Sequence, residues 1–138
     1  MERDNFEVVL VEDNPTDVFV IRNILGQSCS DVTLRVLTDG QEALRYFENL
    51  AGDESSRPPS IVLLDLNIPK VSGFDVLRKI RSISRWDRIP VVIVTSSNSR
   101  EDHVTAQQLS ADAFFNKPAD LRAYFELGGL VQQILGSR

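Results

Sequence analysis

The residues of this chain that could carry out chemistry are three carboxylates, one hydroxyl and one ammonium, and each of them follows or closes a short apolar run. They are Glu12, Asp13, Asp65, Thr95 and Lys117. Three carboxylates that meet at one point repel one another unless a cation joins them, and hard oxygen ligands of this kind suit Mg²⁺. A hydroxyl and an ammonium opposite them can neutralise the oxygens of a phosphoryl group while a carboxylate acts as nucleophile. Taken singly, each residue also has an ordinary structural explanation, so the hypothesis depends on their convergence.

The segment that must position the central carboxylate is the apolar run Ile-Val-Leu-Leu at 61–64, which leads directly into Asp65. An unbroken apolar run predicts a strand that is buried on both faces, as in a parallel sheet. Pro69 cannot extend a strand ladder, so we expect the strand to end close to Asp65. Open α/β sheets place their ligand sites beyond the carboxyl ends of such strands. The alternative is that Asp65 is a solvated acid that merely ends the strand.

Apolar runs and helical periodicities alternate along the rest of the chain. Strands are predicted at 6–11, 32–36, 61–64, 90–95 and 113–115, and the second is expected at a sheet edge because it alternates apolar and polar residues. Helices are predicted from the cap Asn14 and Pro15 to Gly26, around 43–50, around 74–80, from a capping box formed by Ser99 and Asp102, and over 121–135 with a break at Gly128-Gly129. Five strand–helix repeats predict an α/β fold of three layers, αβα, with a parallel sheet.

The composition indicates an ordinary globular protein. The chain has 138 residues, of which 42% are hydrophobic and 25% are charged, and we expect one domain over 1–138. A net charge of −5 without a basic stripe argues against nucleic-acid binding. The single cysteine, Cys29, excludes an internal disulfide and favours a reducing compartment. Because no apolar run could span a bilayer and the polar N-terminus is not a signal peptide, we expect a cytoplasmic protein without membrane contact.

Four short motifs add a family resemblance. They are Val-Glu-Asp-Asn at 11–14, Leu-Leu-Asp-Leu-Asn-Ile-Pro-Lys-Val-Ser-Gly at 63–73, Val-Thr-Ser at 94–96 and Phe-Phe-Asn-Lys-Pro at 114–118. In this order and spacing, the chain resembles the receiver domain of bacterial two-component response regulators over essentially its whole length. The resemblance implies the flavodoxin-like receiver fold with strand order 2-1-3-4-5. Because the chain ends at Arg138, soon after the fifth predicted helix, we expect a single receiver domain without an output domain.

The resemblance assigns a phosphoacceptor and a metal site. Asp65 is implied to be the residue that receives the phosphoryl group. Asp13, Glu12, Asp65 and the main-chain carbonyl of Asn67 are implied to hold Mg²⁺. The chain departs from the family in having Glu12 where an Asp is often found. It also has Ser72 where an Asp often precedes the glycine at 73, and from this departure we expect only a local effect on the turn.

Further roles are implied around the acceptor. Thr95 would hydrogen-bond a phosphoryl oxygen, Lys117 would pair with one, and Phe114 occupies the place of the switch aromatic whose packing responds to Thr95. The Lys117–Pro118 bond is expected to be cis, as in the family. The residues implied to tune dephosphorylation are Asn67 and Ser97.

The implied function is that of a phosphoacceptor signalling protein, not a conventional enzyme, which promotes its own phosphorylation and dephosphorylation. The chain is also similar to single-domain regulators that partner phytochrome histidine kinases. This similarity lies in the loop 52–59 and in the segments 67–70 and 88–92. The implied partners are a sensor histidine kinase or a histidine phosphotransfer protein, docking near Val18, Ile21, Arg22 and Pro118. The last sheet edge and final helix could form a homodimer, or the helix could simply cover the sheet.

Two other functions compete with this interpretation. A phosphatase of the haloacid dehalogenase type uses a similar Asp, Thr and Lys set, but it carries a second acid where this chain has Asn67. A pseudo-receiver that binds partners without phosphorylation is disfavoured because every active-site position is filled.

Overall fold

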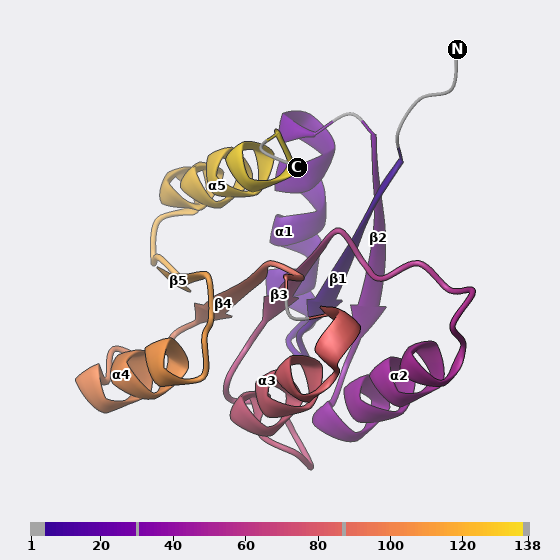
Figure 1. The fold of residues 1–138 in the computed structure, drawn as a ribbon. Helices are drawn as coiled ribbons and strands as arrows, with labels where there is room; N and C mark the ends of the chain where they lie inside the picture. The colour runs from indigo at the N-terminus through magenta and orange to yellow at the C-terminus, as the bar shows by residue number, and fades with distance from the viewer. Residues whose placement is uncertain (1–4, 30, 87, 137–138) are drawn as a thin grey trace.

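A five-stranded parallel sheet forms the centre of the computed structural model, which describes residues 5–29, 31–86 and 88–136 (Figure 1). Its strands are β1 (Phe6–Val11), β2 (Val32–Leu37), β3 (Ile61–Leu64), β4 (Val91–Thr95) and β5 (Ala113–Asn116). They lie in the order β2-β1-β3-β4-β5, and every neighbouring pair is parallel. The predicted strands, the strand order and the edge position of β2 are confirmed.

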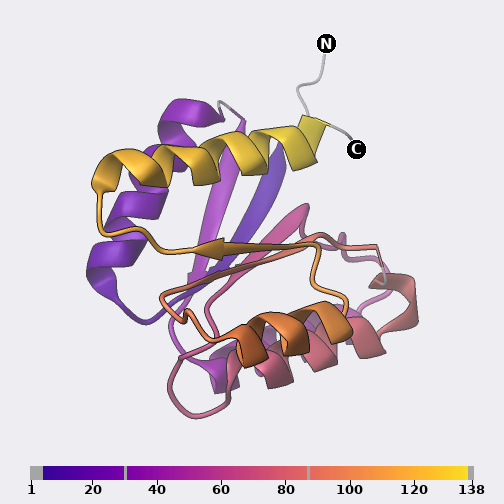
Figure 2. The same ribbon diagram turned by 90° about the vertical axis from the view of Figure 1, so that its left-hand side faces the viewer.

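Helices cover both faces of the sheet. They are α1 (Pro15–Ser28), α2 (Gly40–Gly52), α3 (Gly73–Ser82), α4 (Arg100–Gln108) and α5 (Phe125–Gly136), with short 3-10 helices η1 (Ser84–Trp86) and η2 (Leu121–Tyr124). α1 and α5 lie on one face, and α2, α3 and α4 lie on the other (Figure 2). This is the expected three-layer αβα fold. The described helices are all too short or too polar to cross a membrane.

The side chains of β1 alternate between the two helical layers. Val8 and Leu10 pack with Ile21 of α1, whereas Val9 and Val11 pack on the side of α2 and α3. All four strand residues are buried, and β3 and β4 are buried along their whole lengths. Burying one such side chain stabilises the fold by about 1.5–3 kcal/mol. The strands therefore give a rigid base to the residues that follow their carboxyl ends.

α1 begins where the sequence predicts and ends later. The Asn14 side chain accepts hydrogen bonds from the backbone of the first turn, including the N–H of Asp17. The helix runs two residues past Gly26, the predicted end, and closes with a bond from the Cys29 N–H to the Leu25 carbonyl at 2.8 Å. Gly26 was the wrong stop because burial of Leu25 holds this turn against the sheet, and an exposed helical glycine costs only about 1 kcal/mol.

The capping box at the start of α4 is only half formed. The Ser99 hydroxyl accepts a hydrogen bond from the Asp102 N–H at 3.2 Å, as expected. The Asp102 carboxylate does not complete the box, because it accepts a hydrogen bond from the Ser97 hydroxyl at 2.6 Å. The Ser99 N–H donates to the Ser97 oxygen instead. The prediction of a reciprocal box was wrong, and Ser97 supplies the missing bonds.

α5 continues without interruption through its glycine pair, so the predicted break at Gly128-Gly129 was also wrong. Gly128 is buried where α5 crosses α1. A Cβ at this position would lie 2.9 Å from Ile24 Cγ2 and would overlap the Ser28 side chain. The glycine therefore allows the two helices to approach closely, whereas the space around Gly129 is open.

The glycine pair offers a matched test of this packing. Gly128→Ala is expected to destabilise the protein by about 1–3 kcal/mol, because the added methyl forces α5 away from α1. Gly129→Ala is expected to stabilise it by about 0.5–1 kcal/mol, since alanine favours a helix and nothing lies within 4 Å. Urea unfolding measures both free energies of unfolding, and equal effects of the two substitutions would contradict the packing argument.

Candidate functional site

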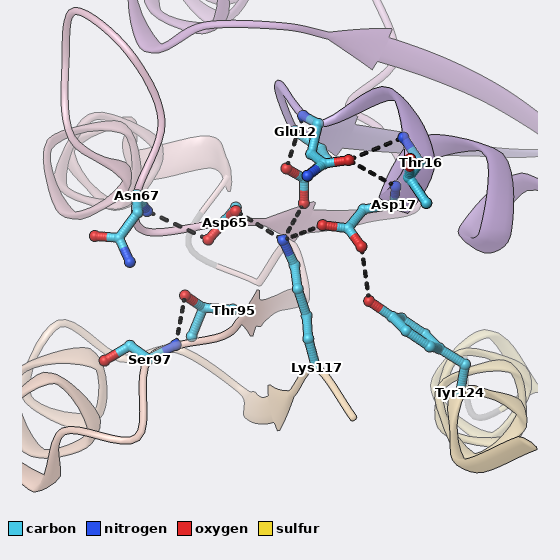
Figure 3. A network of polar contacts seen from close by, with 10 residues as sticks. Glu12, Thr16, Asp17, Asp65, Asn67, Thr95, Ser97, Lys117 and Tyr124 are labelled. Carbon is cyan, nitrogen blue, oxygen red and sulfur yellow. Dashed lines mark hydrogen bonds and ion pairs between the residues drawn. The ribbon is translucent and has the colours of Figure 1, made fainter. Parts of the chain in front are cut away.

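The carboxyl ends of β1, β3, β4 and β5 bring the predicted residues to one edge of the sheet. Glu12 follows β1, Asp65 follows β3, Thr95 is the last residue of β4 and Lys117 follows β5. Glu12, Asp65 and Thr95 are buried, and Asp13 beside them is exposed. Figure 3 shows the carboxylates of Glu12 and Asp65 directed at the lysine. The convergence on which the hypothesis depends is therefore present.

Lys117 is the centre of the network. Its Nζ lies 2.6 Å from Glu12 Oε1, 2.8 Å from Asp17 Oδ2 and 2.9 Å from Asp65 Oδ2 (Figure 3). Burial by itself lowers the pKa of the ammonium. The bonds to the three carboxylates outweigh burial, so the pKa of Lys117 lies above its usual range. The side chain is therefore a fixed positive charge at the base of the site.

Asp17 and Tyr124 belong to this network although sequence reasoning gave them no role. Asp17 stands on the first turn of α1, and Tyr124 ends η2. The Tyr124 hydroxyl donates to Asp17 Oδ1 at 3.1 Å. Burial and the Asp17 charge together raise the pKa of this hydroxyl. The only signal in the sequence was an acid three residues after the cap Asn14, a pattern that is ordinary at helix starts.

The carboxylates of Glu12, Asp13 and Asp65 form a group that fits a divalent cation. Each offers one oxygen, and these oxygens all lie within 4.8 Å of one another. They border an open cleft of about 610 Å³ that is also lined by Asn67 and Lys117. All donors are hard oxygens, as Mg²⁺ requires. The residues present therefore fit the predicted magnesium site.

The pKa of the Glu12 carboxyl group lies above its ordinary value. Burial raises its pKa to about 7, with the Asp65 charge adding to the effect and the Lys117 bonds opposing it. In the metal-free protein, this carboxylate therefore holds a proton to higher pH than in the unfolded chain. Ionised Glu12 therefore costs free energy in the metal-free protein even with Lys117 beside it.

This shift predicts how stability depends on pH. Since the folded pKa of Glu12 lies above its ordinary value of 4.5, the stability that protonation provides is lost as the pH rises from about 4.5 to about 7. Over this range, Glu12→Gln is expected to gain about 2–3 kcal/mol relative to the wild type in EDTA. Urea unfolding at several pH values measures the difference. The control Glu101→Gln, at an exposed site on α4, is expected to show no such trend, and a pH-independent difference for Glu12→Gln would contradict the assignment.

The surroundings of Asp65 and Thr95 are also defined. The Asn67 N–H donates to Asp65 Oδ1 at 3.2 Å, and the other Asp65 oxygen faces Lys117. Thr95 Oγ1 accepts from the Ser97 N–H at 3.3 Å. The Ser97 hydroxyl is directed at α4, where it bonds Asp102. Asn67 is thus beside the acceptor, whereas the hydroxyl of Ser97 is engaged elsewhere.

Phe114, the predicted switch aromatic, lies on β5. Its ring stacks on the exposed His103 of α4, with 4.5 Å between the ring centroids and 16° between their planes. The ring is half-buried against the core on the side of α2, α3 and α4. Any movement of Phe114 must therefore break or shift its contact with α4.

The predicted docking residues separate into exposed and buried members. Arg22 is exposed, Val18 is half-buried, and Pro118 lines the cleft. Ile21 was placed wrongly on this surface, because its side chain is 0% exposed and packs in the core. Ile21 belongs to the buried face of α1, which is turned to the sheet.

A second correction concerns the peptide bond before Pro118. The expected cis bond is not found, since the described residues contain no cis peptide, and the Lys117–Pro118 bond is trans. Trans is the intrinsically favoured isomer of an X–Pro bond, by about 0.5–1 kcal/mol. The Lys117 N–H nevertheless bonds the Thr95 carbonyl at 2.8 Å, so the lysine is held beside β4 with the trans bond in place.

Comparisons with known proteins agree with this site. The sequence profile of the response regulator receiver domain matches residues 8–127. Response regulator Rcp1 from Synechocystis sp. is 32% identical over 120 residues, which cover 87% of this chain and 82% of Rcp1. The chain belongs to the response regulator receiver family, whose members are phosphoacceptor signalling domains.

Solved structures extend the comparison. The phosphorylated cyanobacterial phytochrome response regulator RcpA has a TM-score of 0.86 and 30% identity, over 97% of this chain and 96% of that one. The receiver domain of the sensor histidine kinase PA1611 from Pseudomonas aeruginosa, solved with magnesium in its active-site cleft, has a TM-score of 0.76 and 25% identity, over 96% and 99%. The fold is therefore the receiver fold, and a phytochrome-associated regulator is among the proteins most similar to this chain.

Proposed function

We propose that this protein accepts a phosphoryl group from the phosphohistidine of a histidine kinase onto Asp65, in a reaction that depends on Mg²⁺. The observation that carries the proposal is the position of Asp65. Its carboxylate has Lys117 Nζ at 2.9 Å on one side and shares a cation-sized space with Glu12 and Asp13 on the other. A nucleophilic carboxylate between a fixed ammonium and a set of metal ligands is suited to phosphoryl transfer.

The transfer follows from the roles of these groups. An oxygen of Asp65 forms a bond to phosphorus while the bond from phosphorus to the kinase imidazole nitrogen breaks, and the nitrogen keeps the electron pair. Lys117 and the Thr95 hydroxyl then hold phosphoryl oxygens. Glu12, Asp13, Asp65 and the main-chain carbonyl of Asn67 would hold Mg²⁺, which when bound neutralises phosphoryl charge.

The response to phosphorylation involves the residues behind the site. Thr95 would turn toward the phosphoryl group, and Phe114 would move into the space that Thr95 leaves, breaking its stacking on His103. This movement changes the surface of α4 and β5. Hydrolysis of the aspartyl phosphate would return the original state, with Asn67 beside the path of the attacking water and Ser97 at its margin.

The partner that this account favours is a histidine kinase of the phytochrome type, or a histidine phosphotransfer protein. The similarity to RcpA, a cyanobacterial phytochrome response regulator that is 30% identical to this chain, supports this choice. Val18 and Arg22 on α1 and Pro118 at the cleft would contact the partner. Exposed aromatic and aliphatic side chains lie on the same side of the molecule, namely Phe19, Leu121 and Phe125.

A second, independent proposal is a homodimer through β5 and α5. Within the described residues, β5 pairs with β4 alone, so its other edge is open to a second copy of the chain.

Phosphorylation itself is tested with acetyl phosphate. Intact mass of the wild type is expected to show one phosphoryl adduct with Mg²⁺ and none in EDTA, because the carboxylates otherwise repel the donor. Asp65→Asn is expected to show no adduct under either condition, and its unfolding transition checks that it folds. If Asp65→Asn formed as much adduct as the wild type, the assignment of Asp65 as the phosphoacceptor would be contradicted. No adduct and no binding of beryllium fluoride by the wild type would favour the pseudo-receiver.

A further inference from the structure

A fourth carboxylate in the site has a contact pattern different from the other three. Within the described part of the chain, the acids that come close enough to share a cation are Glu12, Asp13 and Asp65, and Asp17 is outside this group. Asp17 instead bonds Lys117 through one oxygen, at 2.8 Å, and Tyr124 through the other, at 3.1 Å. It is therefore turned toward the lysine and toward η2, away from the proposed metal position.

The number of donors on the lysine gives this contact a consequence. An ammonium has three N–H donors, and three carboxylates surround Lys117 Nζ within 2.9 Å. Two of these carboxylates, Glu12 and Asp65, also belong to the proposed metal set. The lysine and a cation therefore compete for them, and Asp17 is the partner that the lysine can keep while they are engaged elsewhere.

Asp17 is itself held firmly. Its backbone N–H bonds the cap side chain of Asn14 at 3.2 Å, which fixes the first turn of α1. The Tyr124 hydroxyl bonds the other oxygen of its carboxylate, and Tyr124 is buried in the core on the side of α1 and α5. These contacts place the Asp17 carboxylate between Lys117 and Tyr124.

We propose that Asp17, oriented by the Tyr124 hydroxyl, is the positioning residue that keeps Lys117 bonded when Glu12 and Asp65 bind a cation, so that the ammonium does not compete for these carboxylates and stays available to a phosphoryl oxygen on Asp65. Without Asp17, the ammonium bonds more strongly to the metal-binding acids and blocks the site. The part of this inference that concerns phosphorylation rests on the proposed function, whereas the part that concerns cation binding does not.

The test is a double-mutant cycle on Mg²⁺ affinity. Titration is followed by the amide resonance of Asn67, whose N–H bonds Asp65. Asp17→Asn is expected to weaken Mg²⁺ binding at least fivefold when Lys117 is present, and at most twofold in the Lys117→Met background. Tyr124→Phe, which leaves the charge unchanged, is expected to weaken binding about twofold with Lys117 present and not at all in Lys117→Met.

The outcomes separate the possible roles. Equal losses for Asp17→Asn in both backgrounds would mean that Asp17 acts only through its own charge on the cation, and would overturn the proposal. The proposal would also be overturned if Asp17→Asn and Tyr124→Phe bound Mg²⁺ as tightly as the wild type. The control Glu101→Gln removes an exposed charge from α4 and is expected to match the wild type. Acetyl phosphate labelling is expected to slow at least fivefold in Asp17→Asn. If the wild type is not labelled, the proposed function fails, and the Mg²⁺ cycle still decides the role of Asp17.

Discussion

Replacing Lys117 with methionine is expected to slow phosphorylation of Asp65 on the order of a hundredfold, the effect of losing one fixed group that stabilises transition-state charge. The ammonium is the positive side chain that contacts the acceptor, at 2.9 Å. Methionine keeps an unbranched apolar stem of similar length but removes the charged end of the side chain. The rate of adduct formation with acetyl phosphate and Mg²⁺ measures the effect.

The same substitution is expected to lower stability. Lys117→Met leaves the buried carboxylates of Glu12 and Asp65 without their cation, which costs about 3 kcal/mol at pH 8. The cost is expected to shrink at pH 5, because burial raises the pKa of Glu12 to about 7 even with Lys117 present, and the acid then takes up a proton. Lys70→Met, at an exposed lysine before α3, serves as the control. A labelling rate for Lys117→Met within twofold of the wild type would contradict its role.

Gly73→Ala is expected to displace the backbone of the acceptor Asp65 and to lower the free energy of unfolding by about 3 kcal/mol. Gly73 begins α3, and its N–H bonds the carbonyl of Leu66 at 3.0 Å. Leu66 directly follows Asp65, so Gly73 packs against the segment that carries the acceptor. A Cβ on this glycine would lie 2.7 Å from Leu66 Cα and would overlap the Asp65 carbonyl oxygen. These are backbone atoms, so no rotamer change can make room.

Stability and labelling together test this contact. Gly73→Ala is expected to lower both the free energy of unfolding and the labelling rate, because the acceptor loop must shift. Gly52→Ala, at the end of α2 with nothing within 4 Å, is expected to leave both close to the wild type. Wild-type stability and labelling for Gly73→Ala would show that the loop and α3 are not packed as closely as described.

The parts of the fold that depend on local sequence were predictable. A strand buried on both faces is typically an apolar run, so β1, β3 and β4 could be found from the apolar runs in the sequence. The acids at the ends of β1 and β3 followed from these boundaries. Lys117 was found in the same way, because it follows β5 directly.

The parts of the fold that depend on contacts between distant elements could not be predicted from the sequence. The uninterrupted α5 required knowledge that Gly128 meets Ile24 of α1, a contact between residues far apart in the chain. The burial of Ile21 depends on which way α1 turns toward the sheet. Asp17 and Tyr124 meet only because η2 is placed beside the first turn of α1, and no pattern in the sequence links them.

Chemical trapping can show whether Asp65 carries the phosphoryl group. The protein would be incubated with acetyl phosphate and Mg²⁺, then reduced with borohydride, which converts an aspartyl phosphate to homoserine. Peptide mass spectrometry would then locate the product. We expect homoserine at position 65 and at none of positions 13, 17 and 75. Homoserine at another position, with Asp65 unchanged, would contradict the assignment of Asp65 as the phosphoacceptor.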